Sequence, residues 1–282
     1  MLKELFGKEF IYLDGGMGTM LMERGMKAGS RTDMMNIEHP EVVCGIQSEY
    51  VDAGSEILCS NSFSSCSEAL EGTGVTAEEM ITAALNIAKK AARGKAVAAV
   101  DIGPTGHLME PYGDLTYEQA YLRFREQATL GEKAGADLAV VETMSDITEL
   151  RAAVNAVLEN TKLPVFATMT FRDNGKTYIG CSVEEFAEYI NDTPVMAAGM
   201  NCSMSPADMF PVAKKLASLL KKPMIVKLNA GLPDGKTGKY DVTPEAFAQQ
   251  MLQYKELGVK IVGGCCGTTP SHIRALKESF EK

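Results

Sequence analysis

Several features are missing from this sequence, and each absence excludes a class of protein. No apolar run approaches the roughly 18–20 residues that a membrane-spanning helix needs. The formal net charge is −9 and no basic stripe is present to neutralise phosphates, so nucleic acid is not an expected partner. The first nine residues carry acidic side chains and lack a long apolar core, which is unlike a signal peptide. We therefore expect a cytoplasmic protein that binds neither membrane nor nucleic acid.

The chain also lacks a cysteine count that suits a disulfide framework. It has seven cysteines in 282 residues, an odd number in a long chain without a secretion signal. In a reducing compartment, clustered cysteines more often bind metal or take part in catalysis. Histidine is scarce, and His39, His107 and His272 share no pattern. We expect these three histidines on the surface or in loops and not as metal ligands.

The dominant pattern in the chain is an alternation of short apolar runs with helical stretches. Repeated strand–helix alternation implies right-handed crossovers and a parallel sheet, and eight such units in about 250 residues imply a closed barrel. No linker or charge block marks a boundary, so we predict one domain over residues 1–282, a single (β/α)₈ TIM barrel of the α/β class. The predicted strands are residues 10–13, 56–59, 95–100, 137–141, 163–169, 195–198, 223–228 and 259–262.

Helices are predicted between and after these strands from capping and proline signals. A capping box at Thr76 to Glu79 opens one of them, and Pro40 and Pro270 occupy permitted first-turn positions. The predicted helices start near residue 19, cover about 40–53, 76–93, 116–134 and 146–159, and start near 182, 206, 243 and 270.

Conspicuous polar residues come directly after the apolar runs. In a (β/α)₈ barrel the carboxyl ends of all strands meet at one face, where active sites lie. The barrel would therefore bring these residues together although they are far apart in the sequence. They are Asp14, Asn61, Asp101, Glu142, Cys202, Asn229, Cys265 and Cys266.

Three of these residues are cysteines, at the predicted ends of the sixth and eighth strands. Cys265 and Cys266 are adjacent and flanked by glycines, and Cys202 follows Asn201. Zinc accepts thiolate ligands, and a site with three protein ligands leaves a fourth position open for substrate. The residues alone leave two alternatives open, since cysteines are often simply buried and an adjacent pair can form a vicinal disulfide that works in redox chemistry. The cysteines at 44, 59, 66 and 181 follow no pattern, and we interpret them as small core or loop residues.

Two glycine-rich stretches precede helices, at residues 14–19 and 263–267. Neither matches a Gly-x-Gly-x-x-Gly or Walker pattern, so a phosphate cradle is not favoured. Asp14 and Glu142 are carboxylates at the ends of predicted buried strands. They could hold a cationic amine, or they could be structural groups bonded to backbone amides.

Six stretches of the chain, taken together and in order, resemble the homocysteine-binding barrel family. That family includes cobalamin-dependent methionine synthase, betaine–homocysteine methyltransferase and related S-methyltransferases. The details look most like the N-terminal barrel of the methionine synthase branch. The stretches are Asp14-Gly-Gly-Met-Gly-Thr19, Gly103-Pro-Thr-Gly106, Glu142-Thr143, Met200-Asn-Cys-Ser203, Asn229-Ala-Gly231 and Gly263-Gly-Cys-Cys-Gly-Thr-Thr-Pro270.

The resemblance implies a zinc ion held by Cys202, Cys265 and Cys266, with the homocysteine sulfur in the open position. It further implies that Asn229 supplies an oxygen ligand while substrate is absent. Asp14 and Glu142 match residues that hold the homocysteine amino group, and the backbone around Gly15 and Ser62 would receive its carboxylate. One departure is visible: the family usually has Thr-Asn-Thr-Phe where this chain has Ser60-Asn-Ser-Phe63.

The implied activity is methyl transfer to the homocysteine thiol, giving methionine. A free thiol has a pKa of about 8.5, and zinc coordination deprotonates it. Three cysteine thiolates on Zn²⁺ carry a net charge of −1, and a fourth thiolate makes it −2. Such an electron-rich centre would leave the substrate sulfur nucleophilic.

The methyl donor is not evident in this chain. After the eighth strand there is only one predicted helix, and no Asp-x-His-x-x-Gly stretch of the kind that ligates cobalamin. We expect methylcobalamin on a separate corrinoid protein, or a small donor such as S-methylmethionine, S-adenosylmethionine or betaine. The chain could instead be the N-terminal fragment of a larger enzyme, or a homocysteine-binding subunit that is inactive without its partner. A related acceptor such as selenohomocysteine also stays open.

Overall fold

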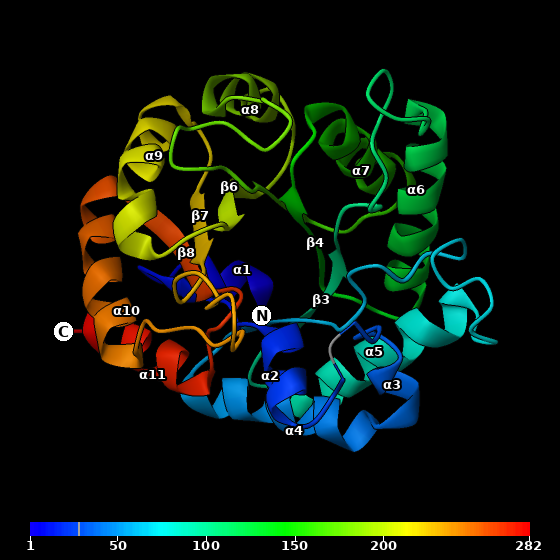
Figure 1. The fold of residues 1–282 in the computed structure, drawn as a ribbon, viewed down its shortest axis with the longest axis horizontal. Coiled ribbons are helices and arrows are strands. Elements are labelled where there is room, and N and C mark those ends of the chain that lie inside the picture. Colours follow the sequence, from blue (N-terminus) through cyan, green and yellow to red (C-terminus); the bar gives the residue numbers. More distant parts are fainter. Residues whose placement is uncertain (28) are drawn as a thin grey trace.

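The computed structural model describes residues 1–27 and 29–282, and these form the predicted barrel. Eight parallel strands line the centre and helices surround them (Figure 1). Around the sheet the strand order is β1-β8-β7-β6-β5-β4-β3-β2. The strands are β1 (Ile11–Tyr12), β2 (Ile57–Cys59), β3 (Val97–Ile102), β4 (Leu138–Met144), β5 (Val165–Met169), β6 (Ala197–Cys202), β7 (Met224–Leu228) and β8 (Val259–Gly264).

The barrel closes between its first two strands through a short seam. Leu13 and Ile57 form a parallel bridge, and the Glu56 N–H donates to the Tyr12 carbonyl at 2.7 Å. At the opposite edge β1 pairs with β8 over two residues. Both contacts are short because β1 itself is only two residues long.

The helices begin where the capping signals predicted. The predicted capping box is present, since the Thr76 hydroxyl accepts from the Glu79 N–H and the Glu79 carboxylate accepts from the Thr76 N–H. The α-helices are α1 (Leu2–Leu5), α2 (Met17–Glu23), α3 (Met35–Glu38), α4 (Pro40–Ala53), α5 (Ala77–Ala92), α6 (Tyr117–Lys133), α7 (Ile147–Asn160), α8 (Val183–Asn191), α9 (Pro206–Leu219), α10 (Pro244–Leu252) and α11 (Pro270–Phe280), with a 3₁₀ helix η1 (Gln253–Leu257) before β8.

The short helix α1 closes the end of the barrel opposite the cysteines, and the sequence pattern did not predict it. Leu5 belongs to the same apolar cluster as Ile11 and Phe166 in the barrel interior. The Phe6 ring packs edge-on against the Phe166 ring, with the centroids 6.0 Å apart. Apolar side chains thus fill this end of the barrel interior, as expected for a barrel whose site lies at the carboxyl ends of the strands.

Four strands extend further than their apolar runs predicted. Asp101 lies inside β3, Glu142 inside β4 and Cys202 inside β6, and not after these strands. Likewise, β8 continues through Gly264 up to the cysteine pair. The reason is that the strand is defined by backbone hydrogen bonds, which continue where the side chains have already become polar.

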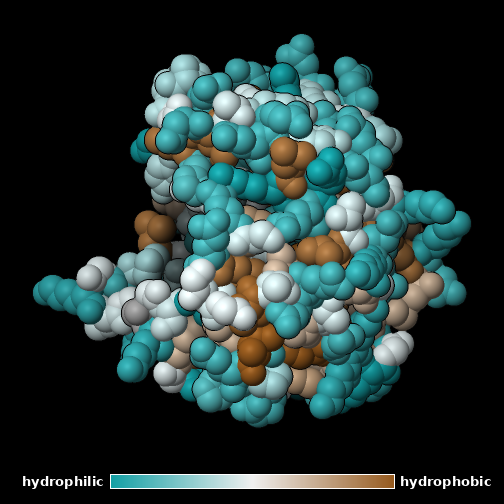
Figure 2. Space-filling view, turned by 90° about the vertical axis from the view of Figure 1, so that its right-hand side faces the viewer, coloured by the Kyte–Doolittle hydropathy of each residue, from teal (hydrophilic) through white to brown (hydrophobic). Residues whose placement is uncertain are grey.

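The outer face of the helical ring is largely hydrophilic. Figure 2 shows one side of the barrel, where hydrophilic residues predominate and hydrophobic ones gather in the middle and lower part. This is the pattern of amphipathic helices that pack one face on a barrel. Within residues 1–27 and 29–282, no helix is long and apolar enough to cross a membrane.

One histidine does not lie where the sequence pattern predicted. His272 is buried in the first turn of α11. Its Nδ1 accepts from the Thr269 N–H at 3.1 Å, and its Nε2 lies 2.9 Å from the Val242 carbonyl. His272 therefore joins the start of α11 to the segment before α10, while His39 and His107 are exposed as expected.

Candidate active site

The three predicted cysteines converge at the carboxyl ends of β6 and β8. The sulfur atoms of Cys202, Cys265 and Cys266 all lie within 4.8 Å of one another. Tetrahedral zinc with Zn–S bonds of about 2.3 Å places its sulfurs about 3.8 Å apart. All three cysteines are free of disulfides. The spacing and the donor set thus fit a thiolate-bound zinc ion.

The pKa values of the three cysteine thiols also favour a bound cation. Hydrogen bonds from Cys202 and Cys265 lower the pKa of Cys266 to about 3. Hydrogen bonding to Cys265 and Cys266 raises the pKa of Cys202 far above the ordinary range of a thiol. Without a neighbouring cation, these hydrogen bonds favour a thiolate at Cys266 and a thiol at Cys202. All three can ionise together only beside a positive charge, which a bound metal ion would supply.

The backbone around the cysteines is held in an uncommon conformation. Thr143, Cys202 and Ser203 have φ angles of 64°, 61° and 74°, in the left-handed region that favours glycine. Asn201, a fully buried residue of β6, secures this backbone. Its Oδ1 accepts from the Thr143 N–H at 2.8 Å and from the Thr168 hydroxyl at 2.7 Å. The strain at the strand ends is typical of a functional site.

The cysteines border a cavity of about 330 Å³ at the carboxyl ends of the strands. Three carboxylates line the same cavity, those of Asp14, Asp101 and Glu142, together with Gly15 and Tyr240. Burial raises the pKa of Asp14 to about 6, and the nearby Lys227 ammonium opposes that rise. Burial and the Glu142 charge raise the pKa of Asp101 well above its usual range. The cavity is therefore small and acidic, as a site for a small cationic ligand would be.

Lys227 is the main residue of this site that the sequence pattern did not reveal. It lies in β7 and is only 4% exposed. Its Nζ donates to Glu142 Oε2 at 2.8 Å and lies 3.7 Å from Asp14 Oδ1. Burial lowers the pKa of Lys227, but the charges of the Glu142 and Asp14 carboxylates raise it well above its ordinary value. A fixed ammonium thus lies beside both carboxylates that the sequence assigned to the substrate's amino group.

Cys59 is also part of this cavity, and the interpretation of it as an ordinary core residue was incomplete. Its sulfur lies with oxygens of Asp101 and Glu142 in a cluster whose atoms are all within 4.8 Å of one another. The Lys227 ammonium is 3.8 Å from the same sulfur. Because the Lys227 ammonium contacts both Cys59 and Glu142, we assign no metal ion to this cluster. Burial raises the pKa of the Cys59 thiol well above its ordinary value, so it stays protonated.

The two residues predicted to meet the substrate carboxylate lie in different settings. Gly15 lines the cavity, and its N–H has no hydrogen-bond partner among the described residues. Ser62 is fully buried behind the cavity wall, where its N–H donates to Ser60 O at 2.8 Å and its hydroxyl to Asp101 O at 2.9 Å. From the loop after β2, the cavity is lined by Ser60, Asn61 and Phe63.

Asn229 lies directly after β7, as predicted. Its Nδ2 donates to the Ser203 carbonyl at 2.8 Å. Its Oδ1 is buried and has no hydrogen-bond partner among residues 1–27 and 29–282. A buried unpaired amide oxygen is uncommon, and it fits the expected role as an oxygen ligand in the absence of substrate.

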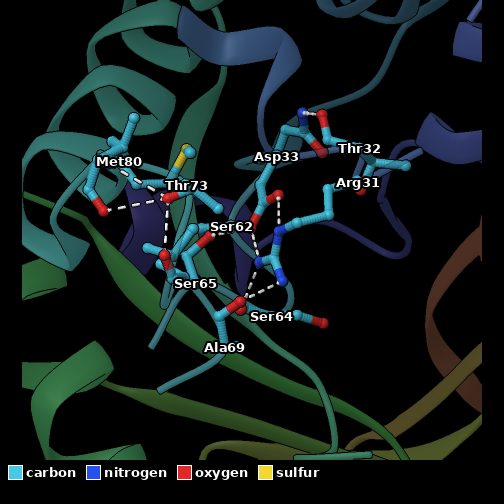
Figure 3. Close-up of polar contacts among 12 residues, drawn as sticks. Arg31, Thr32, Asp33, Ser62, Ser64, Ser65, Ala69, Thr73 and Met80 are labelled. Atoms are coloured by element: carbon cyan, nitrogen blue, oxygen red, sulfur yellow. Dashed lines mark hydrogen bonds and ion pairs between the residues drawn. The ribbon is translucent and has the colours of Figure 1, made fainter. Parts of the chain in front are cut away.

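Arg31 and Asp33, which precede α3, support the loop after β2. Figure 3 shows the Arg31 guanidinium against the Asp33 carboxylate, with contacts of 3.0 and 2.5 Å. Arg31 also donates to the carbonyls of Ala69 and Ser64, and the Ser65 hydroxyl donates to Asp33. This network fixes the loop that carries the cavity-lining residues 60–63.

Tyr240 is a further residue that the sequence pattern did not indicate. It belongs to the stretch between β7 and α10, which lies across the strand ends in front of β8 (Figure 1). Its hydroxyl donates a hydrogen bond that helps to lower the pKa of Cys266. A Cβ atom at Gly267 would lie only 2.1 Å from the Tyr240 ring, so a glycine is required there. Tyr240 thus forms part of the wall beside the cysteines.

A comparison with models of protein families decides the relationship. The model described as homocysteine S-methyltransferase matches residues 11–280. The chain belongs to the homocysteine S-methyltransferase family. The match runs from the first strand to the last helix, so it includes every residue of the cavity described above.

Solved structures confirm the barrel fold of this family member. The metallated form of the homocysteine methyltransferase MmuM from Escherichia coli is 21% identical, with 98% of each chain covered and a TM-score of 0.84. The apo form of the same protein is 23% identical over 96% of each chain, with a TM-score of 0.78. A more distant barrel, the carboxyl transferase domain of Rhizobium etli pyruvate carboxylase, is 13% identical with a TM-score of 0.52, covering 99% of this chain and 48% of that one.

Proposed function

We propose that this protein transfers a methyl group to the thiol of homocysteine, giving methionine, with a zinc ion held by Cys202, Cys265 and Cys266. One observation carries the proposal: three cysteine sulfurs lie within 4.8 Å of one another at one wall of a small acidic cavity. Membership of the homocysteine S-methyltransferase family supports it. The metallated form in which MmuM was solved supports a metal at such a site.

Each part of the cavity has a task in this reaction. When bound, zinc would hold the acceptor sulfur as a thiolate and so raise its nucleophilicity at neutral pH. Asp14 and Glu142 are the carboxylates that the family resemblance predicts beside the acceptor's ammonium group, and the free N–H of Gly15 donates to its carboxylate. The backbone near Ser62 is the second predicted carboxylate contact. These contacts orient the acceptor so that its sulfur faces the cysteines and the open end of the cavity.

The overall change is a substitution at carbon. The acceptor's S–H proton is lost, its sulfur forms a bond to the methyl carbon, and the bond between that carbon and the donor breaks with its electrons staying on the donor. Asn229 would fill the vacant ligand position with its unpaired Oδ1 while no acceptor is bound.

For the methyl donor we propose methylcobalamin carried by a separate corrinoid protein. The loops that follow the strands expose large hydrophobic side chains, which favour a macromolecular partner on that face. The alternatives are the small donors S-methylmethionine, S-adenosylmethionine and betaine, and a subunit that only binds homocysteine until its partner docks. The exposed residues are Leu108, Tyr112, Tyr178 and Leu232.

The decisive experiment measures zinc content and methionine formation in parallel. We expect the reduced protein to bind one zinc ion and to form methionine from homocysteine with one donor of the series. Cys265→Ala should lose the metal and the activity while keeping its circular dichroism, and Cys181→Ala, a buried cysteine away from the site, should keep both. A reduced protein that takes up no zinc would contradict the proposal. Turnover with a small donor but not with methylcobalamin would show that the proposed methyl donor is wrong, while zinc-dependent methylation of homocysteine would stand.

A further inference from the structure

The cavity contains one fixed cation and three carboxylates, which do not share that cation equally. Lys227 Nζ donates to Glu142 at 2.8 Å, whereas the nearest oxygen of Asp14 is 3.7 Å away and beyond hydrogen-bond reach. Lys227 and Glu142 are both nearly inaccessible to water, with exposures of 5% and 7% for their side chains. A buried ion pair of this kind is costly to separate, so Glu142 Oε2 is not available to a ligand.

Two carboxylate oxygens in the same cavity accept no hydrogen bond from the part of the chain that the structure describes. Oδ1 of Asp14 and Oδ1 of Asp101 are buried and form no hydrogen bond with any described residue. The second oxygen of Asp14 accepts from the Cys59 N–H at 2.8 Å, and Asp101 is bonded only through its backbone. Leaving such acceptors unpaired is unfavourable, and both residues line the cavity. These two oxygens lack a donor that an ammonium group, with three N–H bonds, would supply.

We propose that Asp101 together with Asp14 binds the ammonium group of the acceptor amino acid, and that Lys227 is a positioning residue that keeps Glu142 engaged and directs the ammonium to that pair. This inference rests on the proposed function and deepens it. It reassigns the amino-group contact from Glu142 to Asp101. It also predicts that the site selects thiols that carry an ammonium near the sulfur over thiols that lack one.

The experiment compares two thiols that differ only in the amino group. Homocysteine and 4-mercaptobutanoate are titrated calorimetrically into the zinc-loaded protein. We expect Asp101→Asn to weaken homocysteine binding about tenfold or more, because an amide cannot carry the negative charge that a bound ammonium stabilises on the Asp101 carboxyl group. Binding of 4-mercaptobutanoate should not change. If the asparagine variant does not fold, Asp101→Ser provides the same comparison.

The role of Lys227 is tested by combining variants. In Lys227→Met, Glu142 becomes free to share the ammonium, so Asp101→Asn should weaken homocysteine binding clearly less than it does beside Lys227. Lys227→Arg, which keeps the cation, should restore the full effect. A structural loss of packing would not change the ratio of the two thiol affinities in this way.

Each other outcome has a defined meaning. If Glu142→Gln removes the preference for homocysteine and Asp101→Asn does not, the ammonium binds Glu142 and the inference is overturned. If Asp101→Asn lowers the affinity for both thiols equally, the proposed binding of a thiol acceptor stands, but the inference about Asp101 is overturned. If the wild-type protein binds neither thiol, the proposed function fails and this inference fails with it.

Discussion

At the scale of single residues, the site depends on side chains that hold others in place. Asn201 is not itself an expected metal ligand, yet it is bonded to Thr143 and Thr168 across three strands. Its amide nitrogen is also 4.0 Å from the Cys265 sulfur. The left-handed backbone of Thr143 and Cys202 persists because such surrounding contacts determine it.

We therefore predict that Asn201→Ala lowers zinc affinity although it removes no ligand. Loss of a residue that orients metal ligands typically costs about 10–100-fold in affinity. Competition with a chromophoric chelator would measure the change. Asn155→Ala is a matched control, because Asn155 donates to the exposed Tyr117 hydroxyl on the helical ring. Equal zinc affinity in both variants would mean that the cysteines keep their positions without Asn201.

Asp14 gives the site a predicted dependence on pH. Burial raises its pKa from 3.8 to about 6, so the carboxylate is ionised above pH 6 and neutral well below it. An acceptor ammonium stays charged over this range, so its attraction to Asp14 is present above pH 6 and is lost as the pH falls through about 6.

The measurement is the ratio of the affinities for homocysteine and 4-mercaptobutanoate between pH 5 and pH 8. Loss of zinc or protonation of the thiol affects both ligands, so the ratio isolates the ammonium contact. We expect the ratio to fall towards low pH. A ratio that does not change with pH would mean that Asp14 does not bind the ammonium.

At the scale of secondary-structure elements, the junction from β8 to α11 positions the cysteine pair. The Cys265 N–H donates to the Leu228 carbonyl at 2.8 Å, and the Cys266 carbonyl accepts from the Ala230 N–H at 3.0 Å. The pair is thereby attached to the end of β7. Gly267 follows with a φ of +77° and allows the chain to turn beneath Tyr240.

We predict that Gly267→Ala destabilises the protein more than Gly258→Ala. Gly258 has nearly the same φ of +71° but nothing within 4 Å of an added Cβ, so it reports the backbone strain alone. That strain is about 1–3 kcal/mol for a residue other than glycine. At Gly267 the Tyr240 ring must move as well, so homocysteine affinity should also fall. Chemical unfolding and calorimetry would measure the two effects. Equal losses of stability in the two variants would show that Tyr240 moves at no cost.

At the scale of the whole molecule, the barrel is held by apolar layers that do not include the cysteine site. Ile11, Val97 and Phe166 are among the fully buried residues inside the strands. The second and larger apolar cluster joins the strands to the outer helices. The fold should therefore not require the metal.

We predict that chelation of zinc leaves the helical circular dichroism unchanged. The thermal midpoint should fall only by the contribution of ligand binding, which grows with the logarithm of free zinc over its dissociation constant. A thermal scan of the protein before and after chelation, with zinc added back, would test this. Unfolding on chelation would mean that the zinc is structural.

The sequence by itself determined the barrel and the placement of the three cysteines. Hydrophobic runs, capping boxes and polar residues at strand ends are local signals, and they predicted helices such as Pro40–Ala53 to the residue. The meeting of Cys202 with Cys265 and Cys266 followed because parallel strands of one barrel end on one face.

Only the tertiary structure decided how charge is distributed in the cavity. In the sequence, Lys227 is a single charged residue in an apolar run, and its burial depends on acids that β1, β3 and β4 bring to it. Asp101 and Cys59 likewise became cavity residues through strands remote in the sequence. A buried charge is stable only beside its partners, and those partners are assembled by strand register and barrel closure, which no local pattern in the chain encodes.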